Sequence, residues 1–392
     1  MQKFFTLNDL DVDGKRVLVR TGFDLPVDDE GNIKDDKRIK DALPTIKYLL
    51  ENNAKQIIIC FHMGRPKDRE KKLETGKAAD RLGELLNEEV IKLDNWGEKG
   101  IPDERIVVLE NLRFNPGEKD KNPENRDKFG KELASLADIY VNEAFSNSHR
   151  DHASITSIPK FIPGCFGFSI QKEIEVLGKN LSNPKKPYVA IIGGAKADKI
   201  GVIKSLLTKC DKLIIGGVLA NTFLKAKGID IGASKFDEET LSFADEILEL
   251  GRDKIVLPVD FVVADKFDNN ANSKEADIIP ENWLALDIGA KTIKKYQEIL
   301  KNAKTILWAG PLGVFEFDKF ANGTKQIADF ISKQGATTII GGGDSAAAVE
   351  KLGYADKMTY VATGGGASLE LIQGKKLPGI AALEESYKKF KQ

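Results

Sequence analysis

The stretch TTIIGGGDSAAAVE, residues 337–350, decides the fold. Four β-branched residues run into three glycines, and an aspartate, a serine and a helix-forming alanine run follow. This order predicts a buried strand, a turn and a helix, with Asp344 or Ser345 as the N-cap in a purely structural interpretation. Three glycines in a row also leave the backbone open to close approach, and a helix N-terminus favours anions. The turn is therefore a candidate phosphate-binding site.

Apolar, β-branched runs of the same kind alternate with helical stretches along the whole chain. They occupy residues 15–20, 55–61, 105–110, 138–145, 188–194, 212–217, 254–265, 305–310, 337–343 and 358–366. Continuous apolar strands between helices are typical of parallel sheets covered on both faces. Because one core rarely holds so many strands, the sequence predicts an α/β fold with two doubly wound parallel-sheet, Rossmann-like domains joined by a helix and hinge.

A helical stripe and a proline-containing break mark the boundary between the two domains. Apolar residues recur at helical spacing over residues 170–181, and NPKKP at residues 183–187 interrupts the pattern. We expect a first domain over residues 1–169, a connecting helix and linker over 170–187, a second domain over 188–373 and a C-terminal segment over 374–392. The charged stretch GEKDKNPENRDK, residues 117–128, predicts a solvated loop and helix start.

Composition excludes several classes of protein. The net charge of the 392 residues is −1, which advertises no basic face for nucleic acid. Cys60, Cys165 and Cys210 are far apart without a CxxC motif, which favours a reducing compartment over a disulfide framework. The first residues lack the apolar core of a secretion signal, and no apolar run approaches the ~20 residues of a membrane helix. We expect a cytoplasmic protein without nucleic-acid or membrane partners.

The positions after the predicted strands are basic in the first half of the chain. Ligands of parallel α/β sheets bind there, beyond the carboxyl ends of the strands. The residues are His62, Arg65, Arg113, His149, Arg150 and His152, together with Arg38, where the loop after the first strand enters its helix. A single arginine would most simply form a surface ion pair. Several at equivalent places predict a pocket for a small polyanion, because guanidinium groups bind carboxylate and phosphate oxygens in a bidentate way.

The corresponding positions in the second half are rich in glycine. The turns are GGAKADK (193–199), GGVLAN (216–221), AGPLGVFE (309–316), GGGDS (341–345) and TGGGAS (363–368). Such turns before helices cradle phosphates, so this half is the candidate nucleotide-binding domain. Asp344 is a candidate Mg²⁺ ligand, because Mg²⁺ takes one or two carboxylates together with phosphate oxygens. Lys196 and Lys199 can neutralise phosphate charge that builds up during transfer.

A small anion on one domain and a metal nucleotide on the other indicate phosphoryl transfer, with domain closure to exclude water. The chain has no GxxxxGK[ST] motif, so it is not a P-loop enzyme. A dinucleotide dehydrogenase is an alternative, because GGGDSA formally fits GxGxx[GA]. The acidic residue that such a site needs ~20 positions later is missing, which argues against this alternative.

Motifs from the first strand to residues 374–386 resemble, in order and spacing, those of phosphoglycerate kinases. They are LVRTGFDLP, FHMGRPK, LENLRF, EAFSNSHRDHAS, IIGGAKADKIGVI, PVDFVVAD, LDIGAKT, GPLGVFE, GGGDSAAAVEK and TGGGASLE. The resemblance implies a monomeric glycolytic kinase that reversibly transfers a phosphoryl group between 1,3-bisphosphoglycerate and ADP, giving 3-phosphoglycerate and ATP with Mg²⁺. It also implies that the segment 374–392 returns towards the first domain.

The resemblance assigns residues to both ligands. It implies that Arg38, as the transition-state arginine, and Lys196 and Lys199 are catalytic. On the glycerate side it implies Gly22, Phe23, Asp24, Arg38, His62, Met63, Gly64, Arg65, Arg113 and Arg150. On the nucleotide side it implies Gly194, Ala195, Lys196, Lys199, Gly217, Gly289, Glu316, Gly341, Gly342, Gly343, Asp344 and Ser345. Within this set Glu316 would bind the ribose hydroxyls and Asp344 the metal nucleotide.

The chain departs from the family pattern at several of these places. Gly22 and Asp24 stand where the family has an aspartate and an asparagine, and only two residues separate Lys196 from Lys199 instead of three. Further departures are Val218 and Ala362, and Ala290 and Ala309. These changes leave an alternative open, a phosphoglycerate-kinase-like nucleotide-binding protein with impaired turnover.

Overall fold

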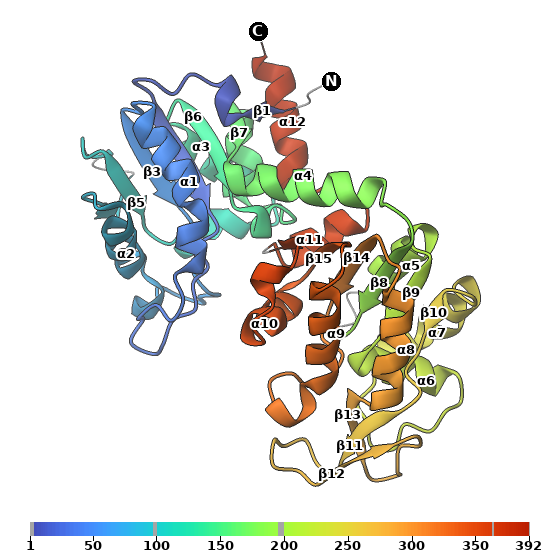
Figure 1. The fold of residues 1–392 in the computed structure, drawn as a ribbon. Helices are drawn as coiled ribbons and strands as arrows, with labels where there is room; N and C mark the ends of the chain where they lie inside the picture. Colours follow the sequence, from blue (N-terminus) through green and yellow to red (C-terminus); the bar gives the residue numbers. More distant parts are fainter. Residues whose placement is uncertain (1–3, 97–99, 195–199, 363, 392) are drawn as a thin grey trace. The chain divides into compact units, whose positions relative to one another are not determined.

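The computed structural model describes residues 4–96, 100–194, 200–362 and 364–391. The chain divides into two compact units (Figure 1). Unit 1 consists of Met1–Glu175 and Lys376–Gln392, and unit 2 consists of Val176–Lys375. The boundary falls inside helix α4, Phe168–Ser182, which starts in unit 1 and ends in unit 2.

Unit 1 is built on a seven-stranded sheet in the order β1-β7-β6-β2-β3-β5-β4, in which every pair of neighbours is parallel. Its strands are β1 Phe5–Thr6, β2 Arg16–Thr21, β3 Gln56–Cys60, β4 Ile91–Leu93, β5 Ile106–Leu109, β6 Ile139–Glu143 and β7 Gly164–Phe166. In the centre, Leu18 of β2 pairs with Ile58 of β3 and Tyr140 of β6. All three are buried, as expected for a sheet that helices cover on both faces.

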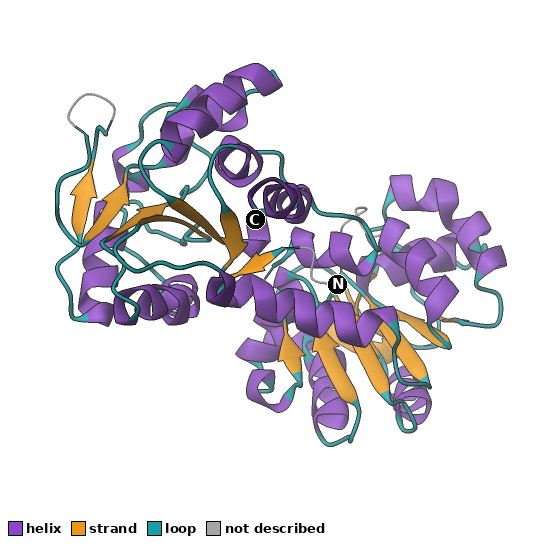
Figure 2. Ribbon diagram, turned by 90° about the horizontal axis from the view of Figure 1, so that it is seen from above, coloured by secondary structure: helices purple, strands orange, loops and turns teal. Residues whose placement is uncertain are grey.

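The helices of unit 1 lie between its strands and at the end of the chain. They are α1 Lys37–Glu51, α2 Gly76–Leu86, α3 Pro123–Ala134, the first part of α4, and α12 Pro378–Phe390. Helix α3 starts at a proline, and the Asn122 side chain caps it by accepting a hydrogen bond from the N–H of Glu124 (3.0 Å). Figure 2 shows helices on both sides of the strands.

The C-terminal helix α12 packs within unit 1, near β1 and β7 in Figure 1. The N–H of Gly379 donates to the carbonyl oxygen of Ser148 (2.9 Å), and the hydroxyl of Ser386 accepts from the N–H of Gly164 (3.0 Å). The ring of Tyr387 contacts that of Phe5, with centroids 4.8 Å apart. The end of the chain therefore completes the core of the unit that its beginning forms.

Unit 2 contains a six-stranded parallel sheet in the order β10-β9-β8-β14-β15-β16 and a three-stranded sheet in the order β12-β11-β13. The larger sheet holds β8 Tyr188–Ile192, β9 Lys212–Ile215, β10 Ile255–Val256, β14 Thr305–Ala309, β15 Thr337–Ile340 and β16 Tyr360–Val361. Its helices are α5 Ile200–Lys209, α6 Gly217–Ala226, α7 Glu238–Leu250, α8 Ala290–Leu300, α9 Asn322–Ser332, α10 Gly343–Lys351 and α11 Gly366–Ile372. Buried aliphatic side chains from β8, β9, β14 and β15 form the core between these layers.

The smaller sheet of unit 2 corrects one expectation. Residues 254–265 read as one strand, but the structure divides them into β10 and β11, Phe261–Ala264. Strand β11 pairs antiparallel with β12, Ser273–Ala276, and with β13, Leu284–Ile288. Pro258 lies at the break, where it lacks the N–H that a continuing ladder would use.

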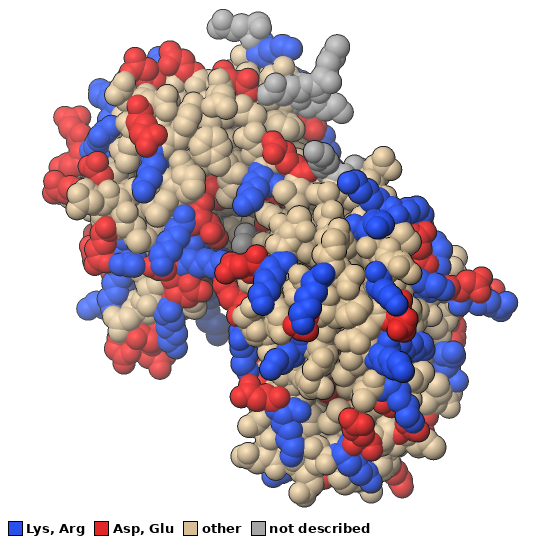
Figure 3. All heavy atoms as spheres, in the orientation of Figure 1, with Lys and Arg blue, Asp and Glu red and all other residues tan. Residues whose placement is uncertain are grey.

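The surface of the protein carries charges of both signs. Lysine and arginine side chains alternate with aspartate and glutamate on the face drawn in Figure 3. This mixture agrees with the net charge of −1. Among the residues that the structure describes, no helix is long and apolar enough to cross a membrane.

Candidate functional site

The carboxyl ends of β2, β3, β5 and β6 lie at one edge of the sheet of unit 1, because these strands are parallel neighbours. The residues predicted for the glycerate side follow them: Gly22, Phe23 and Asp24 after β2; His62, Met63, Gly64 and Arg65 after β3; Arg113 after β5; and Arg150 after β6. Arg38 is in the first turn of α1. The fold thus brings residues from distant parts of the chain to one edge.

The carboxylate of Asp24 links the loop after β2 to the loop after β3. Its Oδ1 accepts a hydrogen bond from the N–H of Gly64 (2.8 Å), and its Oδ2 lies 3.6 Å from Nε2 of His62. Burial raises the pKa of Asp24, but His62, Gly64 and Arg38 outweigh burial and lower that pKa to about 2. Burial lowers the pKa of His62 to about 3. Nearby arginines lower this pKa further, whereas Asp24 raises it. Near pH 7 Asp24 is therefore charged and His62 is neutral.

The side chain of Asn111 forms hydrogen bonds that link the loop after β3 to the loop after β5. The sequence alone did not indicate this role. The side chain of Asn111 is buried, and its Oδ1 accepts from the N–H groups of Met63 (3.2 Å) and Arg113 (3.1 Å). Its Nδ2 donates to the carbonyl oxygens of Met63 (2.9 Å) and Leu73 (3.0 Å). The guanidinium of Arg113 also donates to the carbonyl oxygen of Gly64. These contacts fix Arg113 relative to the loop after β3.

The predicted residues differ in what they can offer a ligand. Phe23 and Met63 are buried in the core of unit 1, so they can present only backbone atoms. Arg38 and Arg65 are exposed, and Nη1 of Arg38 lies 3.4 Å from the carbonyl oxygen of Gly22. These two guanidinium groups are open to a ligand from solvent.

Donor groups without partners accumulate at this edge. Nε2 of His62 and Nε of Arg113 are buried and have no hydrogen-bond partner among the described residues. Burial lowers the pKa of Arg113 to about 10, and repulsion from Arg150 contributes. Burial also lowers the pKa of Arg150, whereas the nearby charge of Asp24 raises it. An excess of positive charge and unpaired donors around one carboxylate is suited to an anion that carries several oxygens.

Glu118 corrects the prediction that residues 117–128 form a solvated stretch. It lies in the 3-10 helix η4, Pro116–Lys119, and its side chain is fully buried. Its carboxylate accepts hydrogen bonds from the N–H (3.0 Å) and the hydroxyl (2.7 Å) of Ser154. Ser154 in turn accepts from Arg20, so a charged residue inside a hydrophilic stretch supports the buried side of the site.

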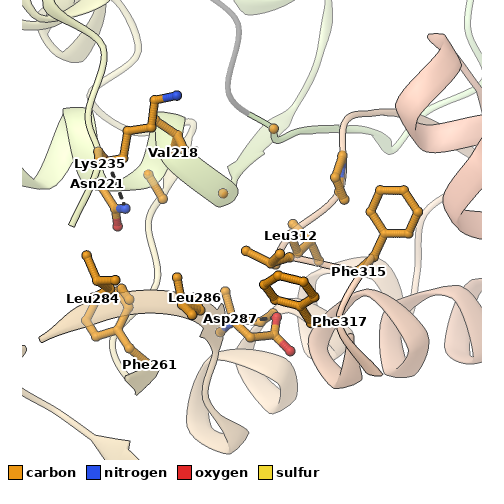
Figure 4. A pocket seen from close by; sticks show the side chains of 18 of the residues that line it. Val218, Asn221, Lys235, Phe261, Leu284, Leu286, Asp287, Leu312, Phe315 and Phe317 are labelled. Carbon is orange, nitrogen blue, oxygen red and sulfur yellow. Dashed lines mark hydrogen bonds between the residues drawn. The ribbon is translucent and has the colours of Figure 1, made fainter. Parts of the chain in front are cut away.

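Unit 2 contains a pocket of about 630 Å³ near the ends of β8, β9, β13 and β14 (Figure 4). Its walls are mainly apolar, with Phe261, Leu284, Leu312 and Phe317 among the residues that line it. Of the residues predicted for the nucleotide side, it includes Gly194, Gly217, Glu316 and Asp344. The described residues Gly289, Gly341, Gly342, Gly343 and Ser345 do not line it. An apolar pocket with a few polar groups at its margin suits a nucleoside.

Two glycine turns meet at one end of this pocket. Gly217 has φ +61°, and a Cβ on it would lie 2.6 Å from the backbone nitrogen of Gly194. The N–H of Gly217 donates to Leu312 (3.1 Å), and that of Gly194 donates to Pro311 (2.9 Å). Glycine is therefore required at 217 for the turns after β8 and β9 to approach the loop after β14.

The helix start at α10 corrects the structural interpretation of Asp344 and Ser345. The N-cap is Gly342, with φ +89°, and no side chain forms a capping hydrogen bond there. Asp344 is exposed in the first turn of α10. The hydroxyl of Ser345 donates to the carbonyl oxygen of Gly341 (2.9 Å) and accepts from the N–H of Gly310, so it joins two turns. Asp344 is thus directed to the pocket margin rather than used as a cap.

Asp287 is a pocket residue that sequence analysis missed. Its carboxylate accepts from the N–H groups of Ile288 (2.9 Å) and Gly323 (2.7 Å). Burial raises its pKa to about 7, against these hydrogen bonds. A Cβ on Gly313 would lie 2.2 Å from its Oδ1, so the surrounding backbone is fitted to this side chain. The apolar run around Asp287 gave no local signal of this role.

Three predicted nucleotide-side residues, Ala195, Lys196 and Lys199, lie outside the described residues. In the part of the chain that is described, no group of three or more His, Cys, Asp and Glu side chains is arranged to hold a metal ion.

Comparisons with known proteins identify the family of the chain. The family model for phosphoglycerate kinase matches residues 7–375. Cytosolic phosphoglycerate kinase 3 of Arabidopsis thaliana is 49% identical over 399 residues, covering 97% of this chain and 98% of that protein. Phosphoglycerate kinase of Thermosynechococcus vestitus is 47% identical, with the same coverage of both chains.

Solved structures give the same result. Phosphoglycerate kinase from Coxiella burnetii has a TM-score of 0.87 and 38% sequence identity, covering 97% of this chain and 99% of that chain. The enzyme from Pyrococcus horikoshii has a TM-score of 0.87 at 34% identity, covering 98% and 100%. Matches over nearly the whole chain support a working kinase rather than a nucleotide-binding relative with impaired turnover. The chain therefore belongs to the phosphoglycerate kinase family and is a glycolytic kinase that transfers phosphate to a carboxyl group.

Proposed function

We propose that this kinase reversibly transfers a phosphoryl group between 1,3-bisphosphoglycerate and ADP, with the glycerate ligand on unit 1. The observation that carries the proposal is the group of donors at the ends of β2, β3, β5 and β6. His62 Nε2 and Arg113 Nε are buried there without hydrogen-bond partners among the described residues. The carboxylate and phosphate oxygens of 3-phosphoglycerate would satisfy such donors.

The nucleotide belongs in the pocket of unit 2. Its apolar walls can enclose a base, and Glu316 at the margin is a hydrogen-bond acceptor for ribose hydroxyls. Phosphates can approach the backbone at two places beside this pocket. These are the glycine turns at Gly194 and Gly217 and the first turn of α10. We also assign Gly289, Gly341, Gly342, Gly343 and Ser345 to nucleotide binding, together with Ala195, which lies outside the described residues.

Mg²⁺ accompanies the nucleotide, with Asp344 as its protein ligand. When bound, the ion supplies charge neutralisation between the phosphate groups. The carboxylate of Asp344 is exposed in the first turn of α10 and lines the pocket, so it can reach a metal held by phosphates there. We therefore assign to Asp344 the orientation of the metal nucleotide.

Arg38, Lys196 and Lys199 are proposed as the groups that stabilise charge on the phosphoryl group in transfer. Arg38 has its guanidinium exposed beside Gly22. We also propose a monomer in the cytoplasm without nucleic-acid or membrane partners. A cytosolic relative supports this location, although another relative, from Arabidopsis thaliana, is chloroplastic.

Titration calorimetry with separate ligands tests the assignment of unit 1. Arg113→Met should weaken 3-phosphoglycerate binding at least about tenfold, because a hydrogen bond to a charged ligand is worth ~1.5–3 kcal/mol. Binding of Mg·ADP should not change. Arg105→Met is a matched control, because Arg105 precedes β5, Arg113 follows it, and Arg105 donates to Leu50 (2.8 Å). Equal 3-phosphoglycerate affinity in wild type and Arg113→Met would contradict the assignment.

A further inference from the structure

Arg20, the fifth residue of β2, is a fully buried cation next to the proposed glycerate site. Its Nη2 lies 2.8 Å from Nδ1 of His62, and its Nε donates to the hydroxyl of Ser154 (2.9 Å). It also donates to the carbonyl oxygen of Thr21. Because none of its surface is exposed, Arg20 acts on a ligand through these partners rather than by contact.

The contact between Arg20 and His62 determines where the imidazole carries its proton. A guanidinium only donates hydrogen bonds, so Nδ1 of His62 must be the acceptor. In the neutral ring the proton then lies on Nε2. That atom is buried and has no hydrogen-bond partner among the described residues, and Oδ2 of Asp24 lies 3.6 Å away, beyond hydrogen-bond distance.

Ser154 links Arg20 to the buried carboxyl group of Glu118. The hydroxyl of Ser154 accepts from Arg20 and donates to Oε1 of Glu118 (2.7 Å), and Oε2 of Glu118 accepts from the N–H of Ser154 (3.0 Å). The side chains of Arg20 and Glu118 are both fully buried, so neither faces solvent. We call Arg20, Ser154 and Glu118 the Arg20 network.

Burial, together with the arginines nearby, keeps the ring of His62 neutral. Burial lowers its pKa to about 3; Arg20 and Arg113 add to this, and Asp24 opposes it. The ring of His152 lies 6.3 Å away between centroids. Burial lowers the pKa of His152 to about 2, so it adds no positive charge near pH 7. His62 is therefore a neutral donor, which loses less by burial than a cation would.

We propose that Arg20 is a positioning residue that fixes His62 as the neutral tautomer protonated at Nε2, so that this N–H donates to the anionic ligand of unit 1. The identity of that ligand as 3-phosphoglycerate rests on the proposed function, whereas the tautomer does not. Sequence alone shows Arg20 as one more basic residue. Its burial and its contact with Nδ1 separate its role from those of Arg38 and Arg113.

Nitrogen-15 NMR of histidine side chains tests the proposal directly. The chain has three histidines, and His62→Gln identifies the His62 signals by their loss. Wild type should show the Nε2–H pattern for His62, unchanged from pH 5 to 8. Adding 3-phosphoglycerate should shift its Nε2–H signal. Arg20→Met should abolish the fixed tautomer and raise the KM for 3-phosphoglycerate at least about tenfold, with kcat nearly unchanged.

Two further variants separate positioning from structural support. Arg20→Lys keeps a donor that can serve Nδ1, so it should retain the Nε2–H pattern. Ser154→Ala disturbs the Arg20 network without removing the contact between Arg20 and His62, so it should also retain the pattern. The NMR pattern of His62 can be recorded in these two variants even if Arg20→Met does not fold.

An Nδ1–H pattern in wild type, or an Nε2–H pattern that persists in Arg20→Met, would overturn the inference. Loss of the pattern in Ser154→Ala would show that general packing controls the tautomer and would overturn it as well. A wild-type Nε2–H signal that ignores 3-phosphoglycerate but shifts with inorganic phosphate would instead contradict the proposed substrate, leaving the tautomer assignment supported.

Discussion

The carboxylate of Asp24 and the N–H of Gly64 are joined by a hydrogen bond of 2.8 Å across the loops after β2 and β3. Asp24 also lies 3.6 Å from His62 Nε2. The chain's own carboxylate thus faces donors that a substrate anion would use. An asparagine stands at this position in the family pattern. The negative charge of Asp24 is therefore a physical reason to expect weaker binding of an anionic ligand than with asparagine at the same position.

We predict that Gly22→Asp combined with Asp24→Asn lowers the KM for 3-phosphoglycerate about tenfold, equivalent to ~1.4 kcal/mol. The amide introduced by Asp24→Asn would keep an oxygen for the N–H of Gly64 while removing a negative charge beside an anion. At Gly22, a Cβ would meet its nearest neighbour, the hydroxyl oxygen of Ser146, at 3.5 Å, so a side chain fits. These contacts act on ground and transition states alike, so kcat should hardly change.

Steady-state kinetics at saturating Mg·ATP provides the measurement for the double variant. Asp29→Asn is the matched control. It removes the same charge from an exposed position further along the segment between β2 and α1. Its KM should equal that of wild type. If the double variant has an unchanged or higher KM, this sequence has rebuilt its pocket at the β2 loop.

Arg38→Ala should lower kcat by about 10²–10³-fold, the usual loss for one electrostatic stabiliser of a transition state. The guanidinium is exposed, and its hydrogen bond to the carbonyl oxygen of Gly22 is long at 3.4 Å, so stability should be unaffected. Affinity for Mg·ADP should also be unaffected. Lys40→Ala, also in the first turn of α1, is the control, and near-normal kcat in Arg38→Ala would reject the role.

Asp344→Ala should weaken Mg·ADP binding at least about tenfold and leave 3-phosphoglycerate binding unchanged. Calorimetry in the presence of a chelator gives a sharper comparison, because metal-free ADP should bind the variant no worse than wild type. Glu350→Ala, in the last turn of the same helix, is the control. Equal weakening of both ligands would make Asp344 a structural residue of α10.

Glu143, at the end of β6, makes stability depend on pH. Its buried carboxylate accepts from the hydroxyl of Thr45 (3.0 Å) and the N–H of Ser169 (3.1 Å). Burial, against these hydrogen bonds, raises its pKa from 4.5 to about 7. Its favourable contribution is therefore fully present below pH ~4.5 and is lost as pH rises through about 7.

We predict that Glu143→Gln becomes more stable relative to wild type as pH rises from 5 to 8, by up to about 3 kcal/mol at 1.36 kcal/mol per pKa unit. Urea unfolding at each pH, followed by circular dichroism, measures the difference. The exposed Glu51→Gln should show no such trend. A difference between Glu143→Gln and wild type that is constant with pH would show that Glu143 ionises normally in the folded chain.

Two features could be predicted because their sequence signals are local. They are the parallel sheets and the residues that follow their strands, which are basic in the first half of the chain and rich in glycine in the second. Apolar strands are continuous runs, and the residues that follow a parallel strand lie at its functional end wherever the strand sits in the sheet. Arg113 and Gly217 are predictable in this way. The same reasoning locates Asp344, although it misassigned the N-cap, which depends on the backbone angle of Gly342.

The supporting residues could not be predicted, because their partners are distant in sequence. Glu118 reads as part of a solvated stretch until the fold places Ser154, 36 residues away, against it. Asn111 joins loops that only the neighbouring positions of β3 and β5 bring together. Asp287 sits among apolar residues, and only the fold shows that the backbone of Gly323 satisfies it.

The most direct test of the central claim is a coupled assay of ATP formation from 1,3-bisphosphoglycerate and ADP, with and without Mg²⁺. We predict that the wild-type chain forms ATP, that a chelator abolishes the reaction, and that Arg38→Ala slows it by about 10²–10³-fold. A folded wild-type chain that binds Mg·ADP and 3-phosphoglycerate but forms no ATP would contradict the account.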